Sequence, residues 1–210
     1  MLYRLLPQEI ALFIEQDRGV GKRHPTNLPP RPSITKWDGC VILSRMTTPA
    51  VAYCEAAPFG RMALLASADG LTALLFASQV ELPPETVAEP GQALAAEGAR
   101  QLLEYLDGGR QAFDLPIDWS AMPPAQAVVL KLVNQIPYGQ VRTYGEIALA
   151  LGKPGASRAV GNANARNPLP LIIPCHRVMG ADGGLRGYGG PGGIPTKAWL
   201  LQFEGALLVP

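Results

Sequence analysis

The densest group of reactive side chains is Cys175-His176-Arg177, at the end of the proline-bounded apolar run NPLPLIIPCHRV. A free cysteine thiol has a pKa of about 8.5, so useful nucleophilicity at neutral pH needs a neighbouring base or cation. His176 is placed to be that base, and Arg177 adds positive potential. However, neighbouring side chains tend to point apart, and buried cysteine is more often inert packing than a nucleophile. The dipeptide alone therefore leaves both interpretations open.

The chain before this cluster has the pattern of three short helices. An apolar stripe predicts the first helix within 123–139, opened by a proline pair. Thr143 and Glu146 match a capping box, which predicts a second helix over 144–151. A tight Gly/Pro turn then leads into a third helix over 156–167. Two short helices joined by such a turn are the outline of a helix-turn-helix.

The third helix is built mostly from small residues, and Arg158 and Arg166 are its only charged side chains. Its backbone could therefore approach a partner closely, as a helix in a nucleic-acid groove must. The same composition also suits packing against a neighbouring helix, so both interpretations remain. Gly161 in its interior costs roughly 1 kcal/mol relative to alanine, which calls for a compensating reason.

In the preceding half of the chain, residues 51–109, the sequence predicts a small sheet followed by one helix. Residues 51–78 predict an antiparallel meander of three strands, with turns at Phe59-Gly60 and Asp69-Gly70. The run 92–109 has apolar residues at helical spacing and ends in a glycine pair. Gly98 lies inside this predicted helix and weakens its intrinsic propensity.

Domain borders follow from these patterns. Residues 1–35 are interpreted as a partly ordered extension, followed by a strand-like segment at 40–44. An N-terminal domain is expected over 36–118 and a C-terminal domain over 123–210. A proline-containing stretch without periodicity, about 113–123, predicts the linker between them.

Composition indicates a folded protein of the reducing cytosol. Forty-eight per cent of the 210 residues are apolar, which is enough for a substantial core. No stretch approaches the roughly 18 uninterrupted apolar residues of a membrane span, and no cleavable signal pattern begins the chain. The three cysteines, Cys40, Cys54 and Cys175, show no pairing typical of a disulfide scaffold, so at least one free thiol is expected.

Charge is distributed unevenly along the chain. Residues 51–118 carry 3 basic and 10 acidic side chains, whereas residues 119–210 carry 8 basic and 3 acidic ones. The first 50 residues carry 7 basic and 4 acidic side chains. This asymmetry favours contact between the C-terminal part and a polyanion, although two oppositely charged solvated surfaces would give the same counts.

A family resemblance decides between these alternatives. The strings RAVGNANARNP, IPCHRV, GYGG and KAWLLQFEG closely resemble the O6-alkylguanine-DNA alkyltransferases, also called methylated-DNA–protein-cysteine methyltransferases. The resemblance covers about 56–210, including APFGRMALLASADGLTALLF and ARQLLEYLDGGRQAFDLPID, and largely excludes 1–50. It implies an α+β fold, with a small ribonuclease-H-like α/β domain and a helical winged helix-turn-helix domain whose recognition helix binds the DNA minor groove.

The resemblance implies direct DNA repair, in which one alkyl group moves irreversibly from O6 of guanine in duplex DNA to the protein after base flipping. Cys175 would accept the alkyl group, His176 would take the thiol proton through a water, and Glu204 would hold the imidazole tautomer. Tyr144 would support the flipped nucleotide and donate to the leaving guanine. Asn167 would link the recognition helix to the active-site loop.

The same resemblance implies positions at the DNA or at the substrate pocket for further residues. Arg158 would enter the space that the flipped nucleotide leaves. The residues expected at the DNA are Tyr144, Ala156, Ser157, Arg158, Gly161 and Asn162. The residues expected at the substrate pocket are Asn164, Val178, Tyr188, Gly189, Gly190 and Lys197. Tyr188 would head the loop that closes one wall, and the Cys175 and Val178 carbonyls would accept from the guanine amino group. Arg177 and Lys197 would anchor loops and supply charge.

The sequence departs from the family at three places in this pocket. Gly189 stands where many members have serine, so a backbone N–H would bond O6. Asn164 stands where some members have an apolar residue, which bears on tolerance of bulky alkyl groups. The loop 189–196 is about two residues longer than is usual.

Cofactors and partners complete the expectation. Some family members bind zinc, but His24, Cys40 and Cys54 would need a fourth ligand and His176 is assigned elsewhere, so no metal and no cofactor are expected. The expected partner is duplex DNA carrying O6-alkylguanine, bound by a cytoplasmic or nucleoid-associated monomer that could assemble cooperatively, with no membrane contact. Two alternatives remain: a non-enzymatic lesion-binding protein, which would lack the acceptor cysteine, and a Cys-His hydrolase, which would turn over.

Overall fold

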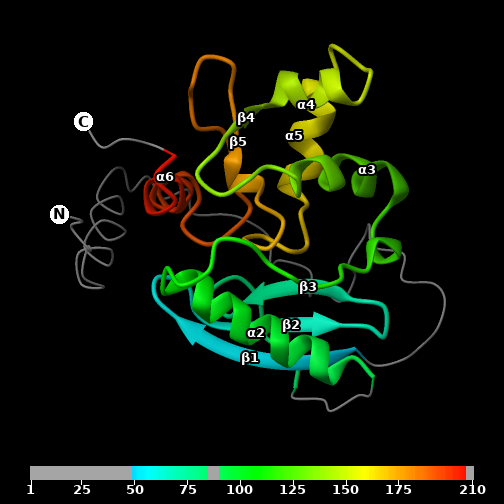
Figure 1. The fold of residues 1–210 in the computed structure, drawn as a ribbon, viewed down its shortest axis with the longest axis vertical. Coiled ribbons are helices and arrows are strands. Elements are labelled where there is room, and N and C mark those ends of the chain that lie inside the picture. The colour runs from blue at the N-terminus through cyan, green and yellow to red at the C-terminus, as the bar shows by residue number, and fades with distance from the viewer. Residues whose placement is uncertain (1–48, 85–89, 207–210) are drawn as a thin grey trace, which may run out of the picture. The chain divides into compact units, whose positions relative to one another are not determined.

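The computed structural model describes residues 49–84 and 90–206, and Figure 1 shows their arrangement with the labels used below. The elements along the chain are β1 (Ala50–Ala56), β2 (Gly60–Ala66), β3 (Leu71–Phe76), α2 (Gln92–Leu106), the 3₁₀ helix η2 (Trp119–Ala121), α3 (Pro124–Val133), β4 (Arg142–Thr143), α4 (Tyr144–Ala150), α5 (Ser157–Ala165), the 3₁₀ helix η3 (Cys175–Arg177), β5 (Val178–Met179) and α6 (Ile194–Phe203). The extension predicted over 1–35 and the strand-like segment 40–44 lie outside the described residues.

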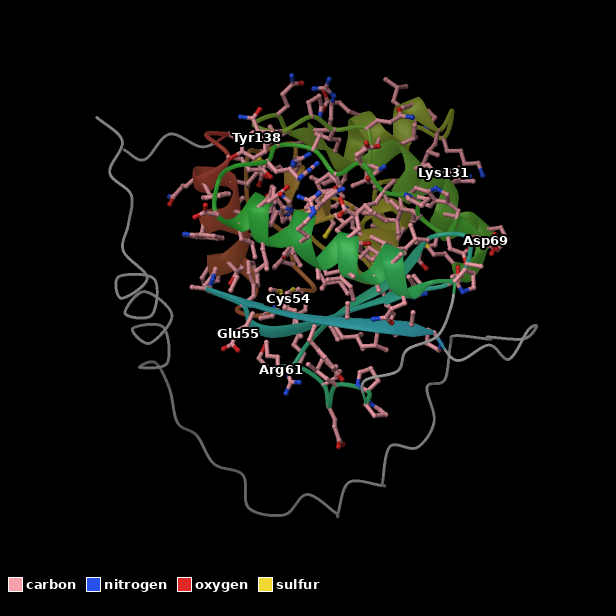
Figure 2. All side chains as sticks on the ribbon, turned by 60° about the horizontal axis from the view of Figure 1, so that its bottom comes forward. Cys54, Glu55, Arg61, Asp69, Lys131 and Tyr138 are labelled. Carbon is pink, nitrogen blue, oxygen red and sulfur yellow. The ribbon has the colours of Figure 1, made fainter. Side chains whose placement is uncertain are left out.

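Strands β1, β2 and β3 form the antiparallel meander that the strand-like runs and their two turns predict, in the order β1-β2-β3 (Figure 1). Successive side chains of a strand point to opposite faces, so one face is apolar and packed. Figure 2 shows Cys54 on the side that faces α2, and Glu55 and Arg61 on the other side. Cys54 is therefore a core residue of the sheet.

Helix α2 packs against the sheet through small residues, which explains the glycine in its middle. A Cβ atom on Gly98 would lie 2.8 Å from Leu64 Cδ2 and 3.2 Å from Leu71 Cδ2. A Cβ atom at this position would therefore require the Leu64 and Leu71 side chains to shift within the packed core. The unfavourable helix propensity of Gly98 is thus offset by the close approach that its missing side chain permits.

The segment predicted as a linker is tied to the sheet. The Leu71 N–H donates to the Pro116 carbonyl at 2.9 Å, and the Asp118 N–H donates to the Leu71 carbonyl at 3.0 Å. The hydrophobic core continues from the sheet and α2 into the helical part, and the described residues belong to one compact unit. The division into domains at 118 and 123 stays a prediction.

The helices of the C-terminal part match the sequence pattern, with one shorter than expected. The capping box is confirmed: Thr143 Oγ1 accepts from the Glu146 N–H at 3.1 Å, and the Glu146 carboxylate accepts from the Thr143 N–H at 2.6 Å. Helix α3 ends at Val133 rather than continuing toward residue 139. Its apolar stripe nevertheless extends to Ile136, which is buried within the following turn. In the described part of the chain, no helix has the length and apolar character needed to cross a membrane.

Candidate active site

A short, tightly bonded loop carries Cys175. Asn167, just beyond the end of α5, donates through Nδ2 to the Ile173 carbonyl at 2.8 Å and accepts from the Leu169 N–H at 3.1 Å. The Ile173 N–H donates to the Leu169 carbonyl at 2.8 Å. Leu171, at the centre of the loop, is fully buried and has φ of 72°, a strained value for a residue with a side chain. Asn167 therefore fixes the loop that delivers Cys175.

Two long-range backbone contacts place this loop. The Leu74 N–H of β3 donates to the Pro168 carbonyl at 2.8 Å, so the sheet supports the loop directly. Strand β4 pairs in parallel with β5, with Arg142 opposite Val178. This pairing ties the segment that follows the cysteine loop to the strand that leads into Tyr144 and α4.

Cys175 borders a cavity of about 500 Å³. The cavity lies between α4, α5, the cysteine loop and the segment 186–189, and its lining residues are Tyr144, Ser157, Arg158, Gly161, Asn164, Ala165, Cys175, Arg186, Gly187, Tyr188 and Gly189. The Cys175 residue itself is only 6% exposed. The thiol is thus a buried group at the wall of a cavity large enough for a nucleobase.

Three residues expected at the pocket do not line the cavity. Val178, Gly190 and Lys197 are all buried away from its wall. The Lys197 ammonium donates to the Val178 carbonyl at 2.5 Å and to the Arg186 carbonyl at 2.9 Å. Lys197 is therefore committed to holding two backbone segments together, in agreement with its expected role as a loop anchor, and its charge lowers the pKa of Cys175 from behind the cavity wall.

The buried Glu204 carboxylate is the centre of a hydrogen-bond cluster beside the cysteine loop. Its Oε1 atom accepts from the Tyr105 hydroxyl at 2.5 Å, from His176 Nε2 at 2.8 Å and from Arg177 Nη2 at 2.8 Å. Its Oε2 atom accepts from Arg177 Nε at 2.8 Å and from the Gly139 N–H at 3.4 Å. The contact between His176 and Glu204, which lie 28 residues apart, is confirmed.

This cluster defines the imidazole tautomer. An ionised carboxylate accepts hydrogen bonds only, so the proton of a neutral His176 ring must lie on Nε2, toward Glu204. Nδ1 then carries the lone pair, and it has no hydrogen-bond partner among the residues that the structure describes. His176 is therefore oriented as a base whose free nitrogen is available to a proton donor.

Burial controls the charges of these groups. It raises the pKa of the Cys175 thiol, against the opposing effects of Asn167 and Lys197. It also lowers the pKa of His176, against the hydrogen bond to Glu204. Burial opposes ionisation of Glu204 as well, but the hydrogen bonds from His176 and Arg177 outweigh it and set the Glu204 pKa at about 2. The resting site thus has a neutral thiol, a neutral imidazole and an ionised carboxylate.

The other ionisable groups near the thiol are also shifted by burial. Burial lowers the pKa of Lys197 to about 8, although the nearby Cys175 opposes this. The pKa values of Tyr144 and Tyr188 are raised, first by burial and second by the charge that Cys175 would carry. Both phenols therefore keep their protons at neutral pH and can donate hydrogen bonds.

Unpartnered polar atoms line the cavity. The Oδ1 and Nδ2 atoms of Asn164 and the hydroxyl of Tyr188 are buried and have no hydrogen-bond partner in the described part of the chain. Such groups are uncommon in folded proteins, because an unmet buried hydrogen bond costs about 1–3 kcal/mol. Their presence together in one cavity wall indicates a site built for a polar ligand.

The exposed face of α5 carries the side chains expected at a partner. Ser157, Arg158 and Gly161 line the cavity, Asn162 is exposed, and Ala156 is half-buried at the start of the helix. The C-terminal end of the helix is held by Gln126, whose amide donates to the Arg166 carbonyl at 2.7 Å. Helix α5 is thus fixed with Arg158 at the cavity.

Two residues at the site were missed by interpretation of the sequence. Tyr105 binds the Glu204 carboxylate, and Arg186 lines the cavity. Tyr105 belongs to an ordinary apolar helix face, so no sequence signal marks it. Arg177 was assigned to anchoring, which agrees with the hydrogen bond from its Nη1 to the Ile136 carbonyl at 2.6 Å. Its ion pair with Glu204 is the additional finding.

The structure offers little for a metal. Within residues 49–84 and 90–206, no three His, Cys, Asp or Glu side chains form a cluster that could hold an ion. Cys54 is buried in the sheet core, and burial raises its pKa to about 11, which disfavours the thiolate that metal binding requires. His24 and Cys40, the other candidates for zinc, lie outside the described residues.

The low pKa of Glu204 predicts an acid-labile fold. Since this pKa of about 2 lies below the value of about 4.3 for an unfolded chain, the stabilisation is complete above about pH 4.3 and is lost as pH falls toward 2. We expect the free energy of unfolding, measured by urea denaturation, to fall between about pH 4.3 and pH 2. The free energy of unfolding of the Glu204→Gln variant should fall by a smaller amount over the same pH interval. Equal losses in both proteins would contradict this assignment.

Similarity to known proteins agrees with this geometry. Residues 124–206 match the family described as 6-O-methylguanine DNA methyltransferase, DNA binding domain. The methylated-DNA–protein-cysteine methyltransferase of Methanosarcina barkeri is 42% identical over 150 residues, covering 70% of this chain and 92% of that protein. The protein of the same name from Mycobacterium tuberculosis is 42% identical over 147 residues, covering 70% of this chain and 87% of that protein. A crystal structure of Mycobacterium tuberculosis OGT in complex with DNA is similar with a TM-score of 0.63 and 38% identity, covering 75% of this chain and 93% of that one.

Proposed function

Because the chain belongs to the methylated-DNA–protein-cysteine methyltransferase family, we propose that Cys175 is the residue of this protein that accepts the alkyl group, on its sulfur atom. The protein repairs DNA by transferring an alkyl group from damaged guanine to a cysteine, and it binds DNA that carries alkylated guanine. One observation carries the assignment to Cys175: its thiol borders a nucleobase-sized cavity, and the next residue is a histidine bonded to an ionised carboxylate.

The proposed reaction is a direct displacement at the alkyl carbon. The sulfur of Cys175 forms a bond to this carbon, the bond from the carbon to O6 breaks, and its electron pair stays on the guanine. The thiol proton passes to Nδ1 of His176 through a water, and Glu204 stabilises the resulting imidazolium. This route agrees with the neutral thiol of the resting site, because only a thiolate attacks fast enough.

Tyr144 is the proposed donor to the leaving guanine. Its ring lines the cavity, and its raised pKa keeps the phenol protonated at neutral pH. A phenol hydrogen bond would stabilise negative charge as it develops on the base. The unpartnered amide of Asn164 and the hydroxyl of Tyr188 are the proposed polar contacts to the rest of the nucleotide, and Gly189 would leave its backbone N–H for O6.

The target base must leave the stack to reach Cys175, which costs a few kcal/mol. We assign α5 to the minor groove as the recognition helix of a winged helix-turn-helix domain spanning 123–210. Arg158 would fill the space that the flipped nucleotide leaves, since it lines the cavity from the side of α5. The sheet and α2 belong to the proposed ribonuclease-H-like domain over 36–118.

The finger role of Arg158 gives a prediction that separates base flipping from chemistry. Arg158→Ala should slow transfer from duplex DNA about 10- to 100-fold, because the flipped state loses its support, but should barely slow transfer from free O6-alkylguanine base. Arg166→Ala removes one charge from the same helix away from the cavity, and we expect only a small, salt-dependent loss on duplex. Equal losses of Arg158→Ala on both substrates would contradict the finger role.

One experiment tests the proposed function directly. The protein is incubated with a duplex containing O6-methylguanine, and peptide mass spectrometry locates the added methyl group. We expect one methyl group per molecule, on Cys175, and no further product when substrate is added in excess. Continued turnover would indicate a Cys-His hydrolase, and tight binding without any transfer would indicate a lesion-binding protein. Methylation at another residue would overturn the assignment to Cys175.

A further inference from the structure

Tyr105 joins the sheet-bearing part of the chain to the candidate active site. It belongs to α2, which packs on the sheet, and its side chain is completely buried. Its hydroxyl donates to Glu204 Oε1 at 2.5 Å across a sequence separation of 99 residues. The carboxylate that orients His176 is therefore held by a helix outside the segment that carries Cys175.

Aromatic packing fixes the position of this hydroxyl. The Tyr105 ring lies edge-on to Tyr138 at a centroid distance of 6.2 Å and edge-on to Phe203 at 5.9 Å. It is tilted against Phe113 at 5.3 Å. Rings in such contacts have little rotational freedom, so the hydroxyl is directed at one oxygen of Glu204.

Three donors share that oxygen. Besides Tyr105, Oε1 accepts from His176 Nε2 and Arg177 Nη2, both at 2.8 Å. A carboxylate oxygen has about two lone-pair sites, so the donors compete for its charge. Each of them limits how strongly the oxygen can bind the others. Tyr105 thereby affects both the position of the carboxylate and its attraction for the His176 N–H.

We propose that Tyr105 is a positioning residue for alkyl transfer, which holds Glu204 in place and moderates its hydrogen bond to His176. This inference rests on the proposed function of Cys175 and adds a role for the sheet-bearing part of the chain in the reaction. Removal of the Tyr105 hydroxyl should allow the Glu204 carboxylate to move more freely. It should also strengthen the interaction of this carboxylate with His176. The first effect slows transfer, and the second makes the imidazole more basic.

The pH dependence of transfer distinguishes this role from packing. The ionisable groups around Glu204 are Tyr105 from α2, Tyr138 from the turn after α3, and His176 and Arg177 from η3. Lys197 of α6 acts on the imidazole at longer range. Among these groups, only a histidine normally titrates near pH 6. The acidic limb of the rate profile should therefore report the basicity of His176.

The test compares Tyr105→Phe with Tyr138→Phe. Tyr138 is the matched control, since its hydroxyl donates to the Phe203 carbonyl at 3.2 Å instead of to Glu204. Single-turnover transfer from an O6-methylguanine duplex is measured from pH 5 to pH 8.5, with thermal stability recorded for each protein. We expect Tyr105→Phe to transfer about 3- to 10-fold more slowly at neutral pH, with the midpoint of the acidic limb about half a pH unit higher. Tyr138→Phe should keep the wild-type profile.

The outcomes separate the inference from the proposed function. If Tyr105→Phe loses thermal stability but retains the wild-type pH profile and rate, its role is packing and the inference is wrong. An acidic limb of the rate profile that shifts equally in Tyr105→Phe and Tyr138→Phe would also overturn the inference, because the shift would then not depend on the hydrogen bond to Glu204. If the wild-type protein does not become alkylated on Cys175, the proposed function itself fails.

Discussion

Replacement of Cys175 by alanine should abolish alkyl transfer while leaving DNA binding nearly unchanged. The sulfur is the atom that forms the new bond in the proposed reaction, so its loss should reduce the rate on the order of 10³-fold or more. The change removes one buried sulfur atom from a cavity wall and leaves the exposed face of α5 as it is. Affinity for duplex should therefore stay within about threefold of wild type, since phosphate contacts dominate it.

Radiolabelled methyl transfer and fluorescence anisotropy with the same duplex measure the two properties together. Cys54→Ala is the matched control, because Cys54 is a second buried cysteine that belongs to the sheet core. Its transfer stoichiometry should equal that of wild type. Retention of wild-type stoichiometry by Cys175→Ala would show that another residue accepts the group.

The second large effect is expected for Glu204→Gln, on both activity and stability. The substitution keeps the size of the side chain but removes the charge that binds Arg177 and orients His176. Loss of one partner of a buried ion pair leaves the other charge uncompensated, at a cost of about 3–5 kcal/mol. Without the carboxylate, the amide can present an N–H to His176 Nε2, which would reverse the tautomer and place a proton on Nδ1.

A reversed tautomer removes the base that Cys175 needs. Transfer by Glu204→Gln should therefore fall by about two to four orders of magnitude, the usual range for loss of a general base. The measurements are single-turnover rates and urea denaturation at pH 7. Glu104→Gln is the control, since Glu104 forms only surface ion pairs with Arg100 and Arg110, and both properties should be close to wild type. A stable Glu204→Gln protein with wild-type transfer would exclude a role for the carboxylate.

These two predictions address different steps of one proposed path. In this path Cys175 would supply the bonding atom, and its thiol is neutral at rest because burial raises its pKa. Glu204 keeps its charge despite burial, because His176 and Arg177 donate to it. The proton therefore moves toward the buried negative charge as the sulfur becomes a nucleophile. Burial disfavours ionisation of the Cys175 thiol. The Glu204 carboxylate offsets this effect, because it stabilises the protonated form of His176 that receives the thiol proton.

Local patterns predicted much of the fold. Apolar runs bounded by turn residues indicated the three strands, and the Thr143–Glu146 pair indicated the start of α4, because each signal arises from residues close together in the sequence. The end of α3 was predicted too late. Ile136 continues the apolar periodicity but occupies a turn, so burial alone does not define where a helix stops.

The candidate site was likewise predicted only in part. Its nucleophile, the adjacent histidine and the distant glutamate were named from motifs that resemble one family. Whether they meet was not decided by those motifs, since the contact between His176 and Glu204 depends on the packing of α6 beside η3. For Lys197 the motif implied both a position at the pocket and a role as a loop anchor, and its hydrogen bonds to two backbone carbonyls agree with the second.

The sequence by itself determined the kinds of element, because residue type and short spacing encode these. Its motifs, by their resemblance to one family, indicated that family and the candidate cysteine and histidine. Only the tertiary structure decided which groups surround Glu204, since Tyr105 and Arg177 reach it from different elements and no local pattern at either residue marks Glu204 as its partner. Burial and hydrogen bonding are properties of that assembled environment. They set the charges of Cys175, His176 and Glu204, on which the proposed chemistry depends.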